Sequence, residues 1–230
     1  MTTPTLGRTV EHDERSWGYA ARASVNPLAR VLWPTSSPAL DQGNVSSCVG
    51  NAVAQCLNHA VYDSSRPGNV ALDEVVAVNL YSWATRHDGV KGVYPTADTG
   101  TSGLAGAKAA KHYGYIPGYR HAFGVDAVLA ALDTGPLIVG TEWTKAMFTP
   151  DKAGFVAPTG VAVGGHEYVL RGKDLSAATP FVWARNSWGP DWGVQDPAGV
   201  AGCFKITVAD LDALLHKQGD ATVLANAAIW

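Results

Sequence analysis

The chain has 230 residues, 47% hydrophobic and 16% charged, which is the composition of a globular protein. Lys and Arg number 17 against 20 Asp and Glu, and they form no basic run, so the net charge of −3 indicates neither a nucleic-acid nor a membrane partner. No stretch approaches 18 apolar residues, and the first 30 residues lack an apolar signal core, so we expect a cytoplasmic protein. Its oligomeric state is not set by the sequence, and a monomer is assumed.

Residues 1–40 are rich in Pro, Arg and Ser and show no sustained period, which predicts an extended arm on the surface of a domain at 41–230. Apolar residues then recur with helical spacing from Val49 to Ala60, directly after the N-cap candidates Ser46 and Ser47.

Two more helices are expected at about 72–86 and about 104–113. The region from about 41 to about 120 is therefore predicted to form a helical lobe.

The second half of the chain changes character, because short β-prone runs alternate with Gly, Pro and Asp. Strands are expected at 137–140, 154–156, 168–171, 181–185, 203–207 and about 221–229, with a short helix near 210–217. Helices first and strands second favour an α+β fold. The β-rich lobe is expected at about 121–230, with a cleft where it meets the helical lobe.

Of the three cysteines, Cys48 stands where the first long helix is expected to begin. Unpaired backbone N–H groups and the helix dipole favour a thiolate there, which would lower the pKa of the thiol below about 8.5. Cys56 and Cys203 are interpreted as packing residues. A thiolate nucleophile needs a base, but His59 lies about 16 Å further along the helix and cannot reach Cys48.

His166 is the better candidate base, because Gly164 and Gly165 turn the chain just before it and a strand follows. Asn186 comes directly after another expected strand and can offer its side-chain carbonyl to the imidazole N–H. Trp188 would shield that hydrogen bond from water.

These motifs together resemble the papain-like cysteine peptidase family. The resemblance rests on Asp41 to Cys48 (DQGNVSSC), on the Gly-His pair before a strand, and on the run from Asn186 to Gly193 (NSWGPDWG). His166 and Asn186 lie 118 and 138 residues after Cys48, near the roughly 130 to 150 typical of the family. The resemblance extends from about residue 40 to about residue 207.

The resemblance implies a two-lobed α+β fold, with a helical left lobe, an antiparallel barrel-like right lobe and the active site between them. It implies that Cys48 attacks a peptide carbonyl, that His166 carries the proton and that Asn186 orients His166. Gln42 would complete the oxyanion hole together with the backbone N–H of Cys48.

Further residues are expected at the substrate, which would be a peptide or protein. The stretch Gly100, Thr101 and Ser102 resembles the substrate-binding segment of bacterial members, and Gly165 and Trp188 complete the set. No cofactor and no metal site are expected, since a single Cys-x-x-His pair is a weak zinc signal. Three alternatives stay open: a hydrolase of peptidoglycan stem peptides of the phage-lysin type, an inactive binding module with a papain fold, and an acyltransferase whose thioester is captured by an amine instead of water.

Overall fold

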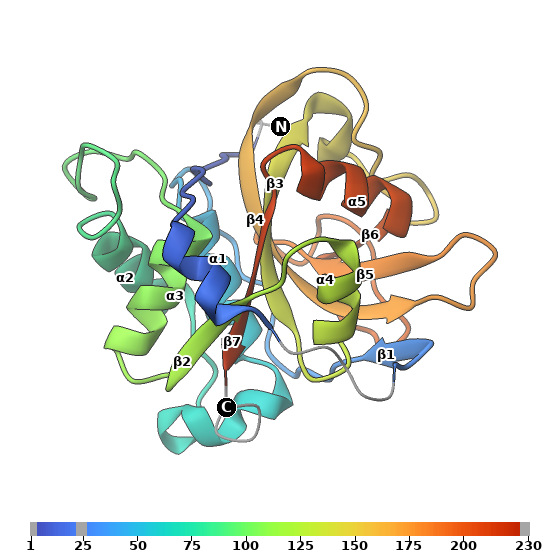
Figure 1. The fold of residues 1–230 in the computed structure, drawn as a ribbon, viewed down its shortest axis with the longest axis horizontal. Helices are drawn as coiled ribbons and strands as arrows, with labels where there is room; N and C mark the ends of the chain where they lie inside the picture. Colours follow the sequence, from blue (N-terminus) through green and yellow to red (C-terminus); the bar gives the residue numbers. More distant parts are fainter. Residues whose placement is uncertain (1–3, 22–26, 226–230) are drawn as a thin grey trace.

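The computed structural model describes residues 4–21 and 27–225 (Figure 1). Its α-helices are α1 (Cys48–Leu57), α2 (Glu74–Ala84), α3 (Gly103–His112), α4 (Val125–Ala131) and α5 (Val208–His216). Its strands are β1 (Arg30–Leu32), β2 (Gly118–His121), β3 (Leu137–Thr144), β4 (Ala162–Asp174), β5 (Phe181–Arg185), β6 (Cys203–Thr207) and β7 (Asp220–Ala225). Short 3-10 helices lie at η1 (Glu14–Tyr19), η2 (Ala60–Ser65), η3 (Pro67–Asn69) and η4 (Lys145–Phe148).

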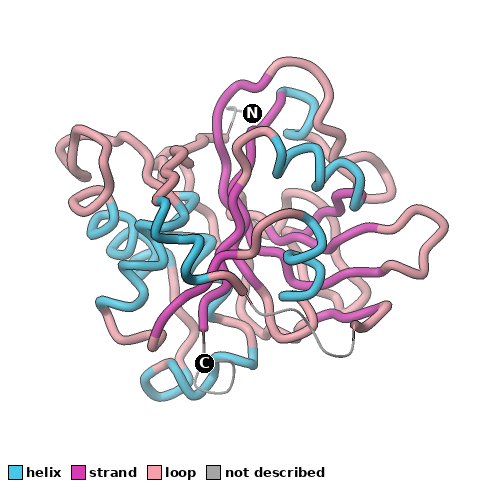
Figure 2. The backbone as a smooth tube through the Cα atoms, in the orientation of Figure 1, coloured by secondary structure: helices cyan, strands magenta, loops and turns pink. Residues whose placement is uncertain are grey.

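One sheet runs through the molecule in the order β2-β7-β3-β4-β5-β6, with β1 paired to β4, and these strands pair antiparallel throughout. Helices α1, α2 and α3 group on one side of the long strands β3 and β4, whereas α4 and α5 lie over another part of the sheet (Figure 2). The expected α+β fold, with a helical N-terminal part and an antiparallel sheet, is confirmed.

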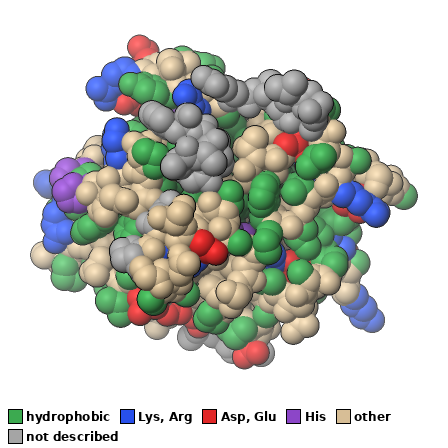
Figure 3. Space-filling view, turned by 90° about the horizontal axis from the view of Figure 1, so that it is seen from below, with side chains coloured by type: hydrophobic (Ala, Val, Ile, Leu, Met, Phe, Trp, Pro, Cys, Tyr) green, Lys and Arg blue, Asp and Glu red, His purple; other side chains and the backbone are tan. Residues whose placement is uncertain are grey.

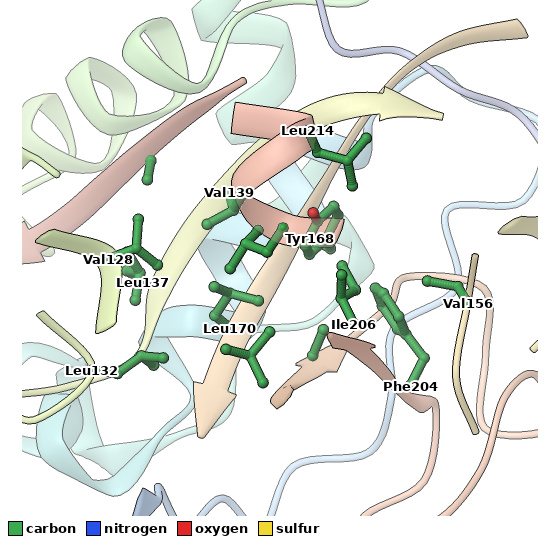
Figure 4. Packing of buried hydrophobic residues seen from close by; sticks show 14 of the residues in the cluster. Val128, Leu132, Leu137, Val139, Val156, Tyr168, Leu170, Phe204, Ile206 and Leu214 are labelled. Atoms are coloured by element: carbon green, nitrogen blue, oxygen red, sulfur yellow. The ribbon is translucent and has the colours of Figure 1, made fainter. Parts of the chain in front are cut away.

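The strands β3 and β4 are buried on both faces, and alternate residues serve different cores. Ile138 and Val169 pack with the helices α1 to α3. Leu137, Val139 and Leu170 pack with the residues of α4 and α5, as Figure 4 shows. Strand β4 therefore connects the two cores, and the residues at its start lie where they meet.

The sequence locates α2, α3, α5, β5 and β6 to within about two residues. The expected first helix extends to Ala60, but α1 ends at Leu57 and the 3-10 helix η2 begins at Ala60. It underestimates β3 and β4, because their Gly residues look like breaks although they lie inside paired strands. Residues 154–156 form no named strand, because Phe155 makes only a single bridge to Lys205. Strand β2 and helix α4 were not expected, and residues 226–229 of the last expected strand lie outside the described residues.

The expected extended arm contains one 3-10 helix, η1, and one short strand, β1, in its described residues. In Figure 1, η1 of its first part lies in front of the helices and contacts β2, and residues 7–9 form backbone hydrogen bonds with both Thr101 and Gly165. Arg8 in this part is only 6% exposed, so the arm is partly buried and does not simply cross the surface.

On the face shown in Figure 3, Lys and Arg side chains lie in several separate places toward the edges and do not gather into one basic patch. Within residues 4–21 and 27–225, no helix has both the length and the apolar character needed to span a bilayer.

Candidate active site

Cys48 is the first residue of α1, with Ser47 in the N-cap position, as the sequence predicts. Every residue of α1 is buried, because the helix packs against α2, α3 and β4 on different sides. Cys48 itself has no exposed surface. The three cysteines are all free thiols.

The environment of Cys48 corrects one expectation from the sequence. Burial raises the pKa of the Cys48 thiol to about 12, although backbone hydrogen bonding from Glu167, Gly7 and Val49 favours the thiolate. The start of a helix alone would lower this pKa, so loss of water outweighs the helix in the arrangement seen here. Cys48 is held as a neutral thiol.

His166 lies in β4, opposite Thr141 of β3, and is completely buried. Its Nε2 lies 2.7 Å from the Oδ1 of Asn186, which follows β5. The other ring nitrogen, Nδ1, is buried without a hydrogen-bond partner. Burial lowers the pKa of His166 to about 4, and the bond to Asn186 opposes this shift. The ring is therefore neutral and has one nitrogen left for another partner.

Two indoles enclose the His166 ring. Trp188 stacks on it with ring centroids 4.7 Å apart, and Trp143 of β3 meets it edge-on at 4.9 Å. Trp188 is 8% exposed and Trp143 is fully buried. Shielding by Trp188 was expected from its position after Asn186; the contribution of Trp143 was not.

The Gln42 side chain is held at both ends. Its Oε1 accepts a hydrogen bond from Ser187 Oγ at 2.7 Å, and this fixes which side of the amide carries the donor. Its Nε2 donates to the backbone carbonyls of Thr5 at 3.1 Å and Val45 at 2.9 Å. Both N–H groups of this amide are therefore engaged with backbone carbonyls, one of which belongs to the arm residue Thr5.

A second amide connects α1 to the segment that carries Asn186. Gln55 Nε2 donates to the Asn186 backbone carbonyl at 3.1 Å, and its Oε1 accepts from Leu40 N. The Asn186 side chain also accepts from Ser187 N at 2.8 Å. These bonds fix the Asn186 side chain relative to the helix that begins at Cys48.

The arm lies across this site. Gly7 N and Arg8 N both donate to the Gly165 carbonyl, at 3.2 and 3.0 Å. On the other side, Thr101 N donates to the Gly7 carbonyl and Thr9 N to the Thr101 carbonyl, both at 2.8 Å. Arg8 and Thr101 thus form a parallel bridge, and the arm covers Cys48.

The expected substrate-binding residues contribute to the arrangement in different ways. Thr101 and Gly165 offer backbone groups to an extended segment, as described for the arm. Gly100 leaves room for it, because a Cβ there would lie 2.1 Å from the Gly7 carbonyl oxygen. The Ser102 hydroxyl caps α3 by accepting from Ala105 N, and it also donates to Glu11 of the arm.

The sequence reasoning missed the buried carboxylate Glu167 and its neighbour Asp220 in β7; Asp220 forms an ion pair with the arm residue Arg8. A signal for Glu167 was present, since a charged residue next to His166 in a buried strand needs a partner. Nothing in the sequence connected it to Asp220, 53 positions later.

The site therefore contains a cysteine at the start of a buried helix, a His–Asn pair on an antiparallel sheet and an oriented amide side chain. The fold is shared with solved structures of papain-like cysteine proteases, so the chain has the papain-like α+β fold. No known family model matches the sequence. No curated protein matches it either.

The similar structures cover nearly the whole chain. Xylellain, a cysteine protease from Xylella fastidiosa, is 16% identical over 98% of this chain and 97% of its own, with a TM-score of 0.68. Digestive procathepsin L2 from the larval midgut of Tenebrio molitor is 18% identical over 96% and 78%, with a TM-score of 0.62. Procathepsin B S9 from Trypanosoma congolense is 13% identical over 94% and 85%, with a TM-score of 0.60.

Proposed function

We propose that the protein is a cysteine endopeptidase with Cys48 as nucleophile, His166 as general base and acid, and Asn186 as the residue that orients the imidazole. The observation that carries this proposal is the state of the His166 ring. His166 Nε2 is hydrogen-bonded to Asn186 Oδ1 at 2.7 Å, whereas Nδ1 is buried and has no hydrogen-bond partner. His166 lies on β4, which packs against α1. A base needs one nitrogen held and the other free to take a proton.

In this proposal the cysteine gives its proton to His166 and the sulfur bonds to the peptide carbonyl carbon. The negative charge on the carbonyl oxygen is stabilised by Gln42 Nε2 and the backbone N–H of Cys48. His166 then protonates the leaving amine as the C–N bond breaks. Water, deprotonated by His166, hydrolyses the resulting thioester and restores the thiol.

The covered arrangement fits a resting state of such a peptidase. With the pKa of Cys48 at about 12 and that of His166 at about 4, neither group is charged at neutral pH. Displacing the arm would readmit water to Cys48 and reduce the burial that raises its pKa. A substrate reaches Cys48 only when the arm moves, because Cys48 is completely buried.

The test uses the full chain with Gly7→Ala, which disfavours arm binding because its Cβ would lie 2.0 Å from the Ser46 carbonyl oxygen. We expect hydrolysis of a peptide panel and labelling of Cys48 by an epoxide-type thiol inhibitor. Adding Cys48→Ala should abolish both. Cys56→Ala, which removes another buried thiol of α1, serves as the control and should keep both activities.

Product sequencing identifies the bonds cleaved, and the same panel should include purified cell walls. Hydrolysis that persists in Cys48→Ala would contradict the proposal. So would a folded Gly7→Ala protein whose Cys48 is labelled but which cleaves no peptide, a result that the inactive binding module predicts.

A further inference from the structure

Three neighbouring strands bring Glu167, Gly140 and Asp220 into one row. Glu167 of β4 is directly opposite Gly140 of β3, and Gly140 is opposite Asp220 of β7. Directly opposite residues of antiparallel strands project from the same face. Because the central residue of the row has no side chain, the two carboxylates face a shared space above Gly140.

Glycines keep this space open from two sides. A Cβ on Gly140 would lie 2.4 Å from Glu167 Oε2 and 2.8 Å from Asp220 Oδ1. A Cβ on Gly103, at the start of α3, would lie 2.7 Å from Asp220 Oδ2 and 2.8 Å from Glu167 Oε1. We call the space bounded by Gly103, Gly140, Glu167 and Asp220 the acidic pocket.

Glu167 is the unusual member of the acidic pocket. It has no exposed surface, and neither carboxylate oxygen has a hydrogen-bond partner. Burial and the neighbouring Asp220 raise the pKa of Glu167 well above its usual value, and Arg8 opposes the shift. A buried carboxylate without a bonded partner is costly unless a cation lies beside it.

Arg8 supplies that cation. Its Nε donates to Asp220 Oδ1 at 3.0 Å, a terminal nitrogen forms an ion pair with the same carboxylate, and another bond of 2.6 Å reaches the Gln218 carbonyl. The Nε lies 2.5 Å from the position that a Gly140 Cβ would take, so the guanidinium fills the space that the missing side chain leaves. Only 1% of the Arg8 side chain is exposed.

The acidic pocket lies next to the proposed nucleophile. Gly7, directly before Arg8, provides backbone hydrogen bonding to the Cys48 thiol. Arg8 itself is held in extended form between Gly165, which accepts from its N–H, and Thr101, with which it forms a bridge. A segment bound along Thr101 and Gly165 therefore directs one side chain into the acidic pocket beside the sulfur.

We infer that the acidic pocket selects a basic side chain, Arg or Lys, in the substrate residue held between Thr101 and Gly165, and that Arg8 of the arm occupies this place in the closed chain. The inference rests on the proposed peptidase function for its substrate. The pocket's preference for a basic side chain is testable without catalysis, because residue 8 is itself a ligand of the pocket.

The first experiment measures how the side chain at position 8 affects the population of the open arm. The alkylation rate of Cys48 in the full chain is compared for wild type, Arg8→Lys and Arg8→Leu, with peptide mapping to identify the cysteine. We expect alkylation of Arg8→Leu to be about ten- to a hundredfold faster than wild type, since a bond to a charged group is lost, and that of Arg8→Lys to lie nearer wild type. Arg15→Leu, an arginine of the same arm that is 83% exposed, is the matched control and should alkylate at the wild-type rate.

The second experiment measures substrate choice in the full chain with Arg8→Ala, which vacates the pocket. Peptides that differ only by Arg, Lys or Leu at the residue held by Thr101 are compared by kcat/KM. We expect Arg and Lys to exceed Leu by about ten- to a hundredfold, mostly through KM. Adding Glu167→Gln or Asp220→Asn should reduce this ratio to within about threefold of unity, whereas Asp126→Asn, which removes an exposed carboxylate of α4, should keep it.

The two experiments separate failure of the inference from failure of the proposed function. Cleavage without preference for basic residues, or a preference that survives both pocket variants, overturns the inference while the peptidase stands. If no peptide is cleaved at all, the peptidase proposal fails and the alkylation series decides the pocket. Equal rates for wild type, Arg8→Lys and Arg8→Leu would then overturn it, and the expected ranking would support it.

Discussion

A hydrogen bond from Ser187 Oγ to Gln42 Oε1 fixes the orientation of the Gln42 amide, and therefore the direction in which its Nε2 donates. A group that is already oriented stabilises developing charge without reorganisation. At the scale of single residues, the site therefore depends on the partners of its side chains as much as on the side chains themselves.

Gln42→Ala should lower kcat for peptide hydrolysis by about 10²- to 10³-fold with little change in KM, as is typical for losing one oxyanion donor. Ser187→Ala removes only the bond that orients the amide and should cause a smaller loss. Steady-state kinetics in the Gly7→Ala chain measures both. An equal, small effect of the two substitutions would mean that Gln42 does not face the reacting oxygen.

Asn186→Ala should lower kcat about tenfold to a hundredfold, because it removes the acceptor that holds His166 Nε2 and leaves that nitrogen unpaired in a buried site. Asn44→Ala, an exposed asparagine ahead of α1, is the control. The rate is compared with the circular dichroism spectrum of each variant. Unchanged kcat in a folded Asn186→Ala protein would remove Asn186 from the proposed mechanism.

The candidate residues themselves were recognisable from the sequence, because each stands in a short local pattern: a cysteine after caps, a histidine after two glycines, an asparagine before Ser-Trp-Gly. Their protonation states were not recognisable. The helix start predicts a lowered pKa for Cys48, but burial under the arm reverses the shift. Burial of a residue depends on which distant segment covers it. The hydrophobic periodicity of its own segment does not predict that distant contact.

At the scale of elements, the arm is the segment whose placement the sequence left most open. It has no apolar period to indicate a buried face. The position of residues 4–21 depends on backbone bonds to Gly165 and Thr101 and on Arg8, the one buried residue among them. The helices α1 and α3 were predictable because their own residues carry a helical stripe. The bonds of Arg8 to Gln218 and Asp220 join residues 210 and 212 positions apart.

Gly7→Ala should increase the alkylation rate of Cys48 by at least about fivefold, because breaking the close approach to Ser46 displaces the arm from the thiol. The cost of a steric conflict of this kind is of order 1–3 kcal/mol, which corresponds to about five- to 160-fold in the population of the open arm. Gly18→Ala, in the same arm, meets no atom within 4 Å and should leave the rate unchanged. Equal rates for the two variants would show that the arm does not limit access to Cys48.

At the scale of the whole molecule, the site lies where the two cores meet, and β4 contributes to both. Ile138 and Val169 pack toward the helices while Leu137 and Leu170 pack toward α4 and α5. His166 is the first fully buried residue of β4, whereas Val163 before it is exposed. His166 is neutral because burial in this environment lowers its pKa.

Two completely buried histidines, His59 and His166, should make the folded protein sensitive to acid. Burial lowers the pKa of His166 to about 4 and that of His59 to about 3, below the 6.5 of an exposed histidine. Below about pH 6.5 these histidines are protonated in the unfolded chain but remain neutral in the folded chain, so the free energy of unfolding falls as pH falls. The loss for each histidine ends near its folded pKa, where both states are protonated.

His166→Ala should therefore flatten the plot of unfolding free energy against pH between about pH 6 and about pH 4, by up to about 1.4 kcal/mol per pH unit. His59→Ala should flatten it over a range that extends about one pH unit lower. Urea unfolding at a series of pH values measures the slopes, which do not depend on the cavity that either substitution leaves, since a cavity shifts the whole curve. Parallel curves for wild type and His166→Ala across this range would mean that His166 is accessible to protons in the folded protein, and the buried, neutral imidazole that holds the site in its resting state would be ruled out.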